Sequence, residues 1–343
     1  MQIRENISLK EFNTFGIDVK AKKLASFSSE TELMELLNVI PENEIQLILG
    51  GGSNILLLRD IEGHVLKNEI EEITVVKEDE EFIYVKSGAG ENWHRFVMYC
   101  LQNNYAGVEN LALIPGNVGA SPMQNIGAYG VEIKDVFHEL EAVHLHEKYK
   151  RKFFIDDCKF GYRESVFKKE LKGQYIITSV TFRLHKQPRF QTSYGAIQEE
   201  LDNMKVDELS IQSIAQAVIN IRTSKLPDPA VIGNAGSFFK NPVVSNEQFE
   251  KLKMQFSSIV AFPVNDHQTK LAAGWLIEHS APADAATWKG YRKGDAGCFS
   301  KQALVLVNYG NASGKEIYQL SEDIIQSVKN KFNIHLEREV NII

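Results

Sequence analysis

Residues 45–54 read Ile45-Gln46-Leu47-Ile48-Leu49-Gly50-Gly51-Gly52-Ser53-Asn54, a short apolar run that leads directly into three glycines. This pattern predicts a β-strand over 45–49 that ends in a glycine turn. Because glycine has no Cβ, consecutive N–H groups of such a turn can hold a phosphate against the main chain. A plain tight turn would have the same sequence, and the residues alone favour neither interpretation.

The segments on either side of this turn indicate further secondary structure. Upstream, Ser29 and Glu32 form a capping-box pattern ahead of a helical apolar stripe, which predicts a short amphipathic helix. Downstream, the runs 74–76 and 82–85 flank the acidic turn 78–81 and predict a β-hairpin.

A second glycine turn, Gly88-Ala89-Gly90, follows the hairpin. Apolar residues then recur at helical spacing from Trp93 to Leu101, so a helix is expected directly behind the turn. A glycine turn in front of a helix N-terminus suggests an anion site. The dinucleotide-binding fingerprint needs a third glycine where Trp93 stands, which argues against an NAD-type domain.

The middle of the chain mixes strands and helices without regular alternation. Strand-like runs at 141–146 and 175–184 precede a helical stripe over 211–221, which ends near the proline-containing segment 225–229. This order predicts an α+β fold with a domain boundary at 225–229.

The C-terminal part repeats the capping-box pattern. Ser313 and Glu316 stand in front of a helical stripe that extends to Phe332. The residues from His335 to Ile343 then predict a last strand.

The composition is that of a folded globular protein of two or three domains, with 343 residues of which 43% are hydrophobic and 24% charged. The net charge of −7 removes the attraction that a polynucleotide needs, so nucleic acid is not an expected partner. The densest basic run, Lys148 with Lys150–Lys152, is interpreted as a solvated loop between two strands. Three widely spaced cysteines, Cys100, Cys158 and Cys298, predict free buried thiols in a reducing compartment.

The uncharged stretch 110–131 is long enough to span a membrane, but its four glycines and two prolines rule out a lipid-facing helix. The backbone groups of such a loop must find partners. Either a large planar or phosphorylated ligand supplies them, or the loop forms tight turns in a core of small residues. The N-terminus carries no apolar run behind its charges, so neither a secretory signal nor a membrane partner is expected.

No set of histidines, cysteines and carboxylates has the spacing of a metal site. His144 and His146 lie in a strand-like run without a third ligand nearby, so they are interpreted as surface residues and no metal is expected.

Seven motifs follow one another along almost the whole chain. They are Asn13-Thr14-Phe15-Gly16, Leu49–Asn54, Gly88-Ala89-Gly90, Ile114-Pro115-Gly116 continuing through Gln124–Gly130, Phe160–Ser165, Gly233–Pro242, and Leu336–Val340. In this order they resemble the UDP-N-acetylenolpyruvoylglucosamine reductase (MurB) family, in its longer subtype with a tyrosine loop.

The resemblance implies an α+β fold with an FAD-binding fold of the vanillyl-alcohol-oxidase type in two regions, plus a separate α+β substrate-binding domain. It places the first FAD-binding region at 1–70, with the C-terminal strand 336–343 returning to it, the second at 71–222, and the substrate-binding domain at 223–335. The implied reaction belongs to peptidoglycan precursor synthesis. NADPH is the co-substrate that reduces FAD, and the small-molecule substrate UDP-N-acetylglucosamine enolpyruvate is reduced to UDP-N-acetylmuramate.

The same likeness implies three catalytic residues. Hydride addition places negative charge on the substrate carboxylate and the adjacent carbon, so a cation or donors and a proton source are needed there. Arg163 matches the arginine that polarises the carboxylate, Glu339 the second polarising group, and Ser237 the proton donor. Glu339 is expected to be protonated or water-linked, with burial raising its pKa. Glu337, on the same strand face, is the alternative to Glu339.

The remaining implied residues contact the cofactor or the substrate. FAD is expected at Gly50, Gly51, Gly52, Ser53, Asn54, Gly116, Gly119, Ala120, Ser121, Asn125, Gly127 and Ala128. The substrate is expected at Tyr162, Tyr194, Lys225, Asn241 and Gln302. Lys225 would attract the diphosphate, and Tyr194 belongs to the loop that closes over it. The basic stretch 288–296 matches no family pattern, and its role stays open.

Two other functions stay open on the sequence. An oxidase of an alcohol or sugar on the same FAD scaffold would react with oxygen and would give no role to Arg163, Ser237 and Glu339. A catalytically silent UDP-sugar-binding protein would carry no flavin. The expected state of the protein is a cytoplasmic monomer.

Overall fold

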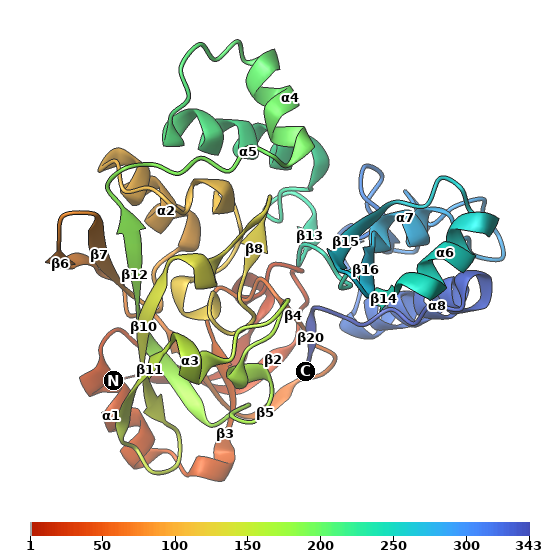
Figure 1. The fold of residues 1–343 in the computed structure, drawn as a ribbon. Helices are drawn as coiled ribbons and strands as arrows, with labels where there is room; N and C mark the ends of the chain where they lie inside the picture. The colour runs from red at the N-terminus through yellow and green to blue at the C-terminus, as the bar shows by residue number, and fades with distance from the viewer. Residues whose placement is uncertain (1) are drawn as a thin grey trace. The chain divides into compact units, whose positions relative to one another are not determined.

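A computed structural model describes residues 2–343 and divides the chain into two compact units (Figure 1). The first unit comprises residues 2–7, 20–52 and 61–224, and the second comprises 8–19, 53–60 and 225–343. The chain leaves the first unit for the last time at the predicted boundary segment 225–229. Met1, which begins the predicted region 1–70, lies outside the described residues.

The predicted strand and glycine turn belong to a four-stranded sheet of the first unit. The strand order is β1 (Ile3–Ser8), β2 (Lys20–Phe27), β5 (Ile61–Asn68) and β3 (Ile45–Leu49), with β5 parallel to both β2 and β3. Helix α1 (Glu30–Val39) begins at Ser29, whose side chain accepts from the Glu32 N–H at 3.2 Å. Its leucines join the same core as the buried strand residues, which confirms the amphipathic helix predicted from the capping box.

A five-stranded antiparallel sheet forms the other layer of this unit. Its order is β11 (Lys150–Phe154), β10 (Phe137–His144), β12 (Tyr175–His185), β7 (Phe82–Gly88) and β6 (Ile73–Glu78), so the predicted hairpin is confirmed as β6–β7. Helix α2 (Trp93–Gln102) packs on this sheet through Trp93 and Phe96. The centroids of their rings lie 5.7 and 4.8 Å from the centroid of the Phe182 ring. Helices α4 (Gly195–Asn203) and α5 (Ile211–Lys225) bury residues in the same core.

The basic run at 150–152 is not a loop as predicted. It lies within β11, at the edge of the sheet, because acidic residues of the neighbouring strand compensate its charge. Glu141 on β10 stands opposite Lys152 in the register, and Lys150 Nζ lies 3.2 Å from its carboxylate. Burial alone would raise the pKa of Glu141, but Lys86 and Lys150 lower it to about 2, so the carboxylate stays charged.

The second unit contains two small antiparallel sheets and three helices (Figure 1). One sheet has the order β13 (Gly233–Asn234), β19 (Leu306–Asn308), β18 (Ala296–Cys298) and β17 (Arg292–Lys293), and the other has β14 (Val243–Ser245), β16 (Gln268–Leu271) and β15 (Ala261–Asn265). The helices are α6 (Asn246–Gln255), α7 (Ala273–Glu278) and α8 (Gly314–Phe332). The predicted capping box of α8 is confirmed, since Ser313 and Glu316 bond each other's main-chain N–H groups.

The predicted C-terminal strand over 335–343 is shorter in the structure. Only β20 (Asn341–Ile342) is a regular strand, parallel to β4 (Ile55–Leu56), and Arg338 makes an isolated bridge with Phe239. Different partners on each side of this segment hold it extended without a continuous ladder.

All three cysteines are buried free thiols, as predicted. The remaining helices and strands are short. Within residues 2–343, no helix is both long and apolar enough to cross a membrane. The short elements are α3 (Ile155–Cys158), β8 (Gly127–Ala128), β9 (Val131–Glu132), and the 3-10 turns at Lys10–Phe12, Glu42–Glu44, Glu109–Leu111, Val118–Ala120, Ile133–Asp135 and Val166–Lys168.

A buried histidine makes the first unit sensitive to acid. His64 on β5 is 2% exposed. Burial and the Lys23 ammonium on β2 lower the pKa of His64 below the ordinary 6.5, although the Glu44 carboxylate, 3.4 Å away, acts to raise it. The unfolded chain therefore binds a proton that the folded chain excludes, so stability should fall as the pH drops below about 6.5. We expect His64→Leu to lose less unfolding free energy than the wild type between pH 7.5 and 5.5 in urea titrations. Equal losses in both proteins would contradict this assignment.

Candidate functional site

The glycine turn after β3 is packed tightly against another loop of the first unit. A Cβ at Gly51 would lie 2.8 Å from Asn117 Oδ1 and 2.9 Å from Gly116 Cα, so no larger residue fits without a shift. Gly52 has φ +64°, which favours glycine. Behind the turn, the Lys67 ammonium on β5 donates to the Gly50 carbonyl at 2.8 Å. The turn therefore offers a main chain free of side chains beside a half-buried positive charge.

The second glycine turn serves packing between backbones. Cβ atoms at Gly88 and Gly90 would lie 2.3 Å from the Ile70 carbonyl oxygen and 2.6 Å from the Ile70 nitrogen. The N-terminus of α2 is already capped, because Asn92 accepts from the Arg95 N–H at 3.0 Å. Close packing between backbones accounts for the glycines at 88 and 90, and an anion at this turn stays a prediction.

The turn 88–90 and the start of α2 also fix residues 116–119 of the long uncharged loop. The Gly119 N–H donates to the Ala89 carbonyl at 2.9 Å, and the Trp93 N–H donates to the Gly116 carbonyl at 2.9 Å. Asn117 completes this ladder by donating to the Gly90 carbonyl at 2.7 Å. The predicted cofactor residues Gly116 and Gly119 are thereby held next to the first glycine turn.

Three residues of this loop and one residue of the 161–164 turn have left-handed backbone conformations. Leu113, Asn125 and Tyr129 have φ values of +59°, +45° and +51°, and Arg163 has +54°. Such conformations cost about 1–3 kcal/mol each for residues other than glycine and gather at functional sites. The first three conformations form turns of the segment 110–131, and a ligand bound at this segment stays a prediction.

The Asn125 side chain holds this loop in place through hydrogen bonds. It is fully buried, and its amide donates to the Glu132 carboxylate at 2.9 Å and to the Gly161 carbonyl at 3.1 Å. Its side-chain oxygen accepts from the Lys134 N–H at 3.1 Å. The side chain of this predicted FAD residue thus joins the loop to the 161–164 turn.

The same loop also holds Arg163. Its guanidinium donates to the Gly127 carbonyl at 2.6 Å and lies 5.5 Å from the centroid of the Tyr162 ring. Ser165, two residues later, donates to the Met123 carbonyl at 2.7 Å. Four predicted residues, Arg163, Tyr162, Gly127 and Asn125, are therefore brought together in the first unit.

Arg222 on α5 is a member of this site that the sequence analysis missed. Its Nε donates to the Leu113 carbonyl at 3.3 Å, and its side chain bonds the Tyr129 phenol. Burial, together with the nearby Arg163, lowers the pKa of Arg222. Burial and Arg222 also lower the pKa of His94, whose neutral ring accepts from the Leu113 N–H at 3.1 Å. The strained Leu113 is thus held from both sides.

A signal for Arg222 was present in the sequence. The buried stripe of α5 contains Ile211, Ala215 and Val218, and the next position at the same spacing is Arg222. An arginine in an apolar stripe is rarely buried without a purpose. Lys67 carried no comparable signal, because a lysine near a strand end is ordinary.

In the second unit, two predicted catalytic residues lie on paired segments. The Glu339 N–H donates to the Phe238 carbonyl, and the Lys240 N–H donates to the Glu337 carbonyl, both at 2.9 Å. Ser237 thus begins a segment that runs antiparallel to the one carrying Glu339. Ser237 and Glu339 therefore lie on two neighbouring, paired segments of the second unit, whereas Arg163 belongs to the first unit.

The structure also distinguishes the two candidate glutamates. The Glu337 side chain is 69% exposed and its carboxylate binds the Lys240 ammonium at 2.5 Å. Glu339 is partly buried, and its main chain is fastened on both sides. An exposed, ion-paired Glu337 is the weaker candidate for polarising a substrate.

The other predicted residues are dispersed. In the second unit, Asn241 accepts from the Ala273 N–H at 2.9 Å and Gln302 from the Leu304 N–H at 3.3 Å. Lys225 is an exposed residue at the end of α5, and the 44% exposed Tyr194 has its ring 5.6 Å from that of Tyr129 in the first unit. The predicted FAD residues Ala120 and Ser121 lie in and after the 118–120 turn, Ala128 lies in β8, and Ser53 and Asn54 belong to the second unit.

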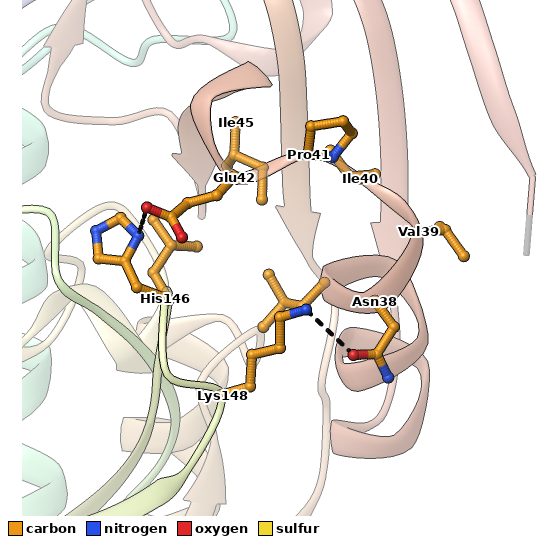
Figure 2. Close-up of a pocket in the computed structure, with 10 residues that line it drawn as sticks. Asn38, Val39, Ile40, Pro41, Glu42, Ile45, His146 and Lys148 are labelled. Atoms are coloured by element: carbon orange, nitrogen blue, oxygen red, sulfur yellow. Dashed lines mark hydrogen bonds and ion pairs between the residues drawn. The ribbon is translucent and has the colours of Figure 1, made fainter.

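A surface pocket of about 350 Å³ lies near the end of α1 and contains none of the predicted site residues (Figure 2). His146 pairs with the Glu42 carboxylate, and the Lys148 ammonium donates to Asn38 Oδ1 at 3.2 Å. Its polar side chains satisfy one another, so the pocket is separate from the candidate site.

Two cations of the basic stretch 288–296 form ion pairs in the second unit. Lys289 pairs with Glu278 at 2.9 Å, and Arg292 pairs with Asp295 at 2.7 Å while lying over the Tyr309 ring. The first ion pair joins the stretch to α7, and the second lies within the turn before β18.

Comparison with known proteins matches both parts of the chain. A family profile described as "UDP-N-acetylenolpyruvoylglucosamine reductase, C-terminal domain" matches residues 228–343, and one described as "FAD binding domain" matches residues 21–148. Proteins named UDP-N-acetylenolpyruvoylglucosamine reductase from Flavobacterium johnsoniae and Amoebophilus asiaticus are 47% and 49% identical to the chain, each over 100% of both sequences. The counterpart from Pseudomonas putida is 46% identical over 100% of this chain and 99% of its own.

A solved structure has the same fold. The crystal structure of UDP-N-acetylenolpyruvylglucosamine reductase from Thermus caldophilus covers 99% of each chain with a TM-score of 0.68 at 22% identity. Together with the FAD-binding profile, this likeness confirms the predicted α+β class with an FAD-binding fold and a separate C-terminal domain.

The close approach at Gly51 gives a direct test of the site's architecture. We expect Gly51→Ala to lower the unfolding free energy by about 1–3 kcal/mol, because its Cβ would push Asn117 and Gly116 away. Gly50→Ala is the matched control, since its Cβ would only touch Asn117 at 3.9 Å, and its effect should stay within about 0.5 kcal/mol. Denaturant unfolding measures both, and equal stabilities would contradict the packing argument.

Proposed function

The chain belongs to the UDP-N-acetylenolpyruvoylglucosamine reductase family of flavin-dependent oxidoreductases, and we propose that it uses NADPH and FAD to reduce UDP-N-acetylglucosamine enolpyruvate to UDP-N-acetylmuramate. Full-length identity of 47–49% supports the substrate and the reaction. The product is a precursor of peptidoglycan. We further propose that the enzyme works in the cytoplasm as a monomer.

The residues of the first unit fit an FAD cofactor. The Gly50–Gly52 turn has no room for a Cβ at Gly51, and Lys67 supplies a positive charge at the Gly50 carbonyl. A side-chain-free turn beside a cation suits a diphosphate. We propose that the FAD-binding residues of the first unit are those of this turn together with Gly116, Gly119, Ala120, Ser121, Asn125, Gly127 and Ala128. When bound, FAD takes up hydride from NADPH and delivers it to the substrate double bond.

Arg163 is proposed to polarise the substrate carboxylate. Addition of hydride to the enolpyruvyl group spreads negative charge onto that carboxylate, and a planar guanidinium can bind both oxygens. The 2.6 Å bond to Gly127 fixes the guanidinium before the substrate arrives. A donor that is already in place needs no reorganisation as charge develops, which is the main source of electrostatic catalysis.

Ser237 is proposed to give its hydroxyl proton to the carbon that develops carbanion character. Serine is a weak acid, but transfer to such a carbon is strongly downhill, and positioned proton donors contribute about 10²–10⁴-fold to rates. Gly236, with φ +68° and its N–H bonded to Asn234 at 3.0 Å, turns the chain directly before this serine. That turn sets the direction in which the 237–240 segment leaves β13.

Glu339 is proposed as the second group at the substrate carboxylate, acting through a proton or a bound water. A charged carboxylate would repel the substrate, so the protonated or water-linked form is the working one. Tyr162, Tyr194, Lys225, Asn241 and Gln302 are proposed to hold the substrate, with Lys225 at the diphosphate.

The observation that carries the residue assignment is the pairing of the Ser237 and Glu339 segments within the second unit. The reaction itself is tested by anaerobic stopped-flow absorbance. We expect NADPH to bleach the bound flavin and the enolpyruvyl substrate to restore the oxidised spectrum rapidly. A flavin that stays reduced until oxygen is admitted would indicate an oxidase, and a purified protein without flavin would indicate a silent UDP-sugar-binding protein.

Ser237→Ala separates the two half-reactions. The variant should be reduced by NADPH at the wild-type rate, because the serine acts only on the substrate, and its reoxidation by substrate should slow about 10²–10⁴-fold. Ser257→Ala, at an exposed serine of the same unit, is the control and should leave both rates unchanged. Equal loss of both rates in Ser237→Ala would refute the proton-donor role.

A further inference from the structure

We propose that Lys240 and Glu337 form a clamp that positions Ser237 and Glu339 relative to each other during substrate reduction. This inference rests on the proposed function, because it assigns a role to residues that serve the second half-reaction. Lys240 lies three residues after Ser237, and Glu337 lies two residues before Glu339. Neither residue of the clamp is proposed to touch the substrate.

The main-chain pairing of the two segments is short. A single isolated bridge, Phe239 with Arg338, joins them, and its two hydrogen bonds run from Glu339 to Phe238 and from Lys240 to Glu337. In a regular sheet, hydrogen bonds join neighbouring strands along their whole length. A pairing as short as this one leaves the two segments free to slide or to separate. An additional link at this point therefore has a direct effect on spacing.

The clamp supplies that link directly beside the bridge. The Lys240 side chain is 10% exposed, and its ammonium donates to the Glu337 carboxylate at 2.5 Å. A charge-assisted hydrogen bond is shorter and stronger than a neutral one. Its lysine end is buried and therefore restricted, so the contact fixes Glu337 against the 237–240 segment.

The neighbouring anchors hold each segment to other elements. Arg338 points to α8, where its Nε donates to Ser321 Oγ at 2.8 Å and its guanidinium reaches the Glu322 carboxylate at 2.7 Å. Phe238 binds the Leu304 carbonyl through its N–H at 2.9 Å. These contacts fix the segments to the body of the unit, whereas the clamp fixes one segment to the other.

Spacing between a proton donor and a polarising group is the quantity that this clamp controls. A displacement of about 1 Å in a catalytic constellation can cost about 10²-fold in rate, even when no reacting group is removed. Loosening the clamp should therefore slow reduction of the substrate and leave reduction of the flavin by NADPH unchanged. An ion pair kept only for stability would have no such selectivity.

The test uses Lys240→Met, which keeps the buried stem and removes the charge, and Glu337→Gln, which keeps the shape of the partner. Both holoenzyme variants should show wild-type flavin reduction by NADPH and about 10-fold slower reoxidation by substrate in anaerobic stopped flow. Lys240→Arg, which restores a cation, should recover most of the rate. Hydrogen exchange at the main-chain amides of residues 238–240 and 337–339 should quicken in the two neutral variants only.

Glu247→Gln is the matched control. It breaks an exposed ion pair of the same unit, between Glu247 and Lys251 on α6, whose charged atoms lie 2.6 Å apart, and it should change neither half-reaction. Two outcomes would overturn the clamp. Unchanged reoxidation and exchange in both variants would show that the pair has no positioning effect. Slower reoxidation in Lys240→Met alone would assign the lysine a direct role without its partner. A wild-type enzyme that fails to reduce the substrate would refute the proposed function. The hydrogen-exchange measurement needs no substrate, so it would still test whether the Lys240–Glu337 pair holds the two segments together.

Discussion

The close approach of Gly51 to Gly116 and Asn117 is the constraint on which the first unit's site depends. Two loops more than sixty residues apart in sequence meet with no space for a Cβ between them. Once they meet, the 116–119 segment is aligned with the 89–93 segment by its hydrogen bonds, so this part of the long uncharged loop is fixed. Because main-chain atoms do not change rotamer, this contact transmits the position of β3 to the loop with little freedom.

On either side of this fixed segment, the loop contains residues with strained backbone conformations. Leu113 and Tyr129 adopt left-handed conformations, and His94 and Arg222 hold the main chain of Leu113 from both sides. These two half-buried side chains keep Leu113 in a conformation that costs about 1–3 kcal/mol. The same logic applies to Arg163, which is strained and bonded to Gly127.

The sequence predicted the regular elements well because their signals are local. Capping boxes placed α1 and α8, and alternation with an acidic turn placed the β6–β7 hairpin. It failed at 150–152, since the carboxylates that make a basic strand stable come from β10 and α1 and carry no local signal. The site residues were predicted from motif resemblance. Lys67 was missed because it is defined only by what it contacts, and Arg222 was missed although its position in the apolar stripe of α5 was a local signal.

Arg222 also constrains what the site can hold. Its described hydrogen-bond partners, the Leu113 carbonyl and the Tyr129 phenol, are both neutral, and burial together with the neighbouring Arg163 disfavours its charged form. A buried cation is costly unless an anion or a dense set of acceptors compensates it. A ligand that brings negative charge between these guanidinium groups would gain from both and would relieve their mutual repulsion. Burial and the neighbouring Arg163 thus make the positive charge of Arg222 costly to the folded chain, and a bound anion would offset that cost.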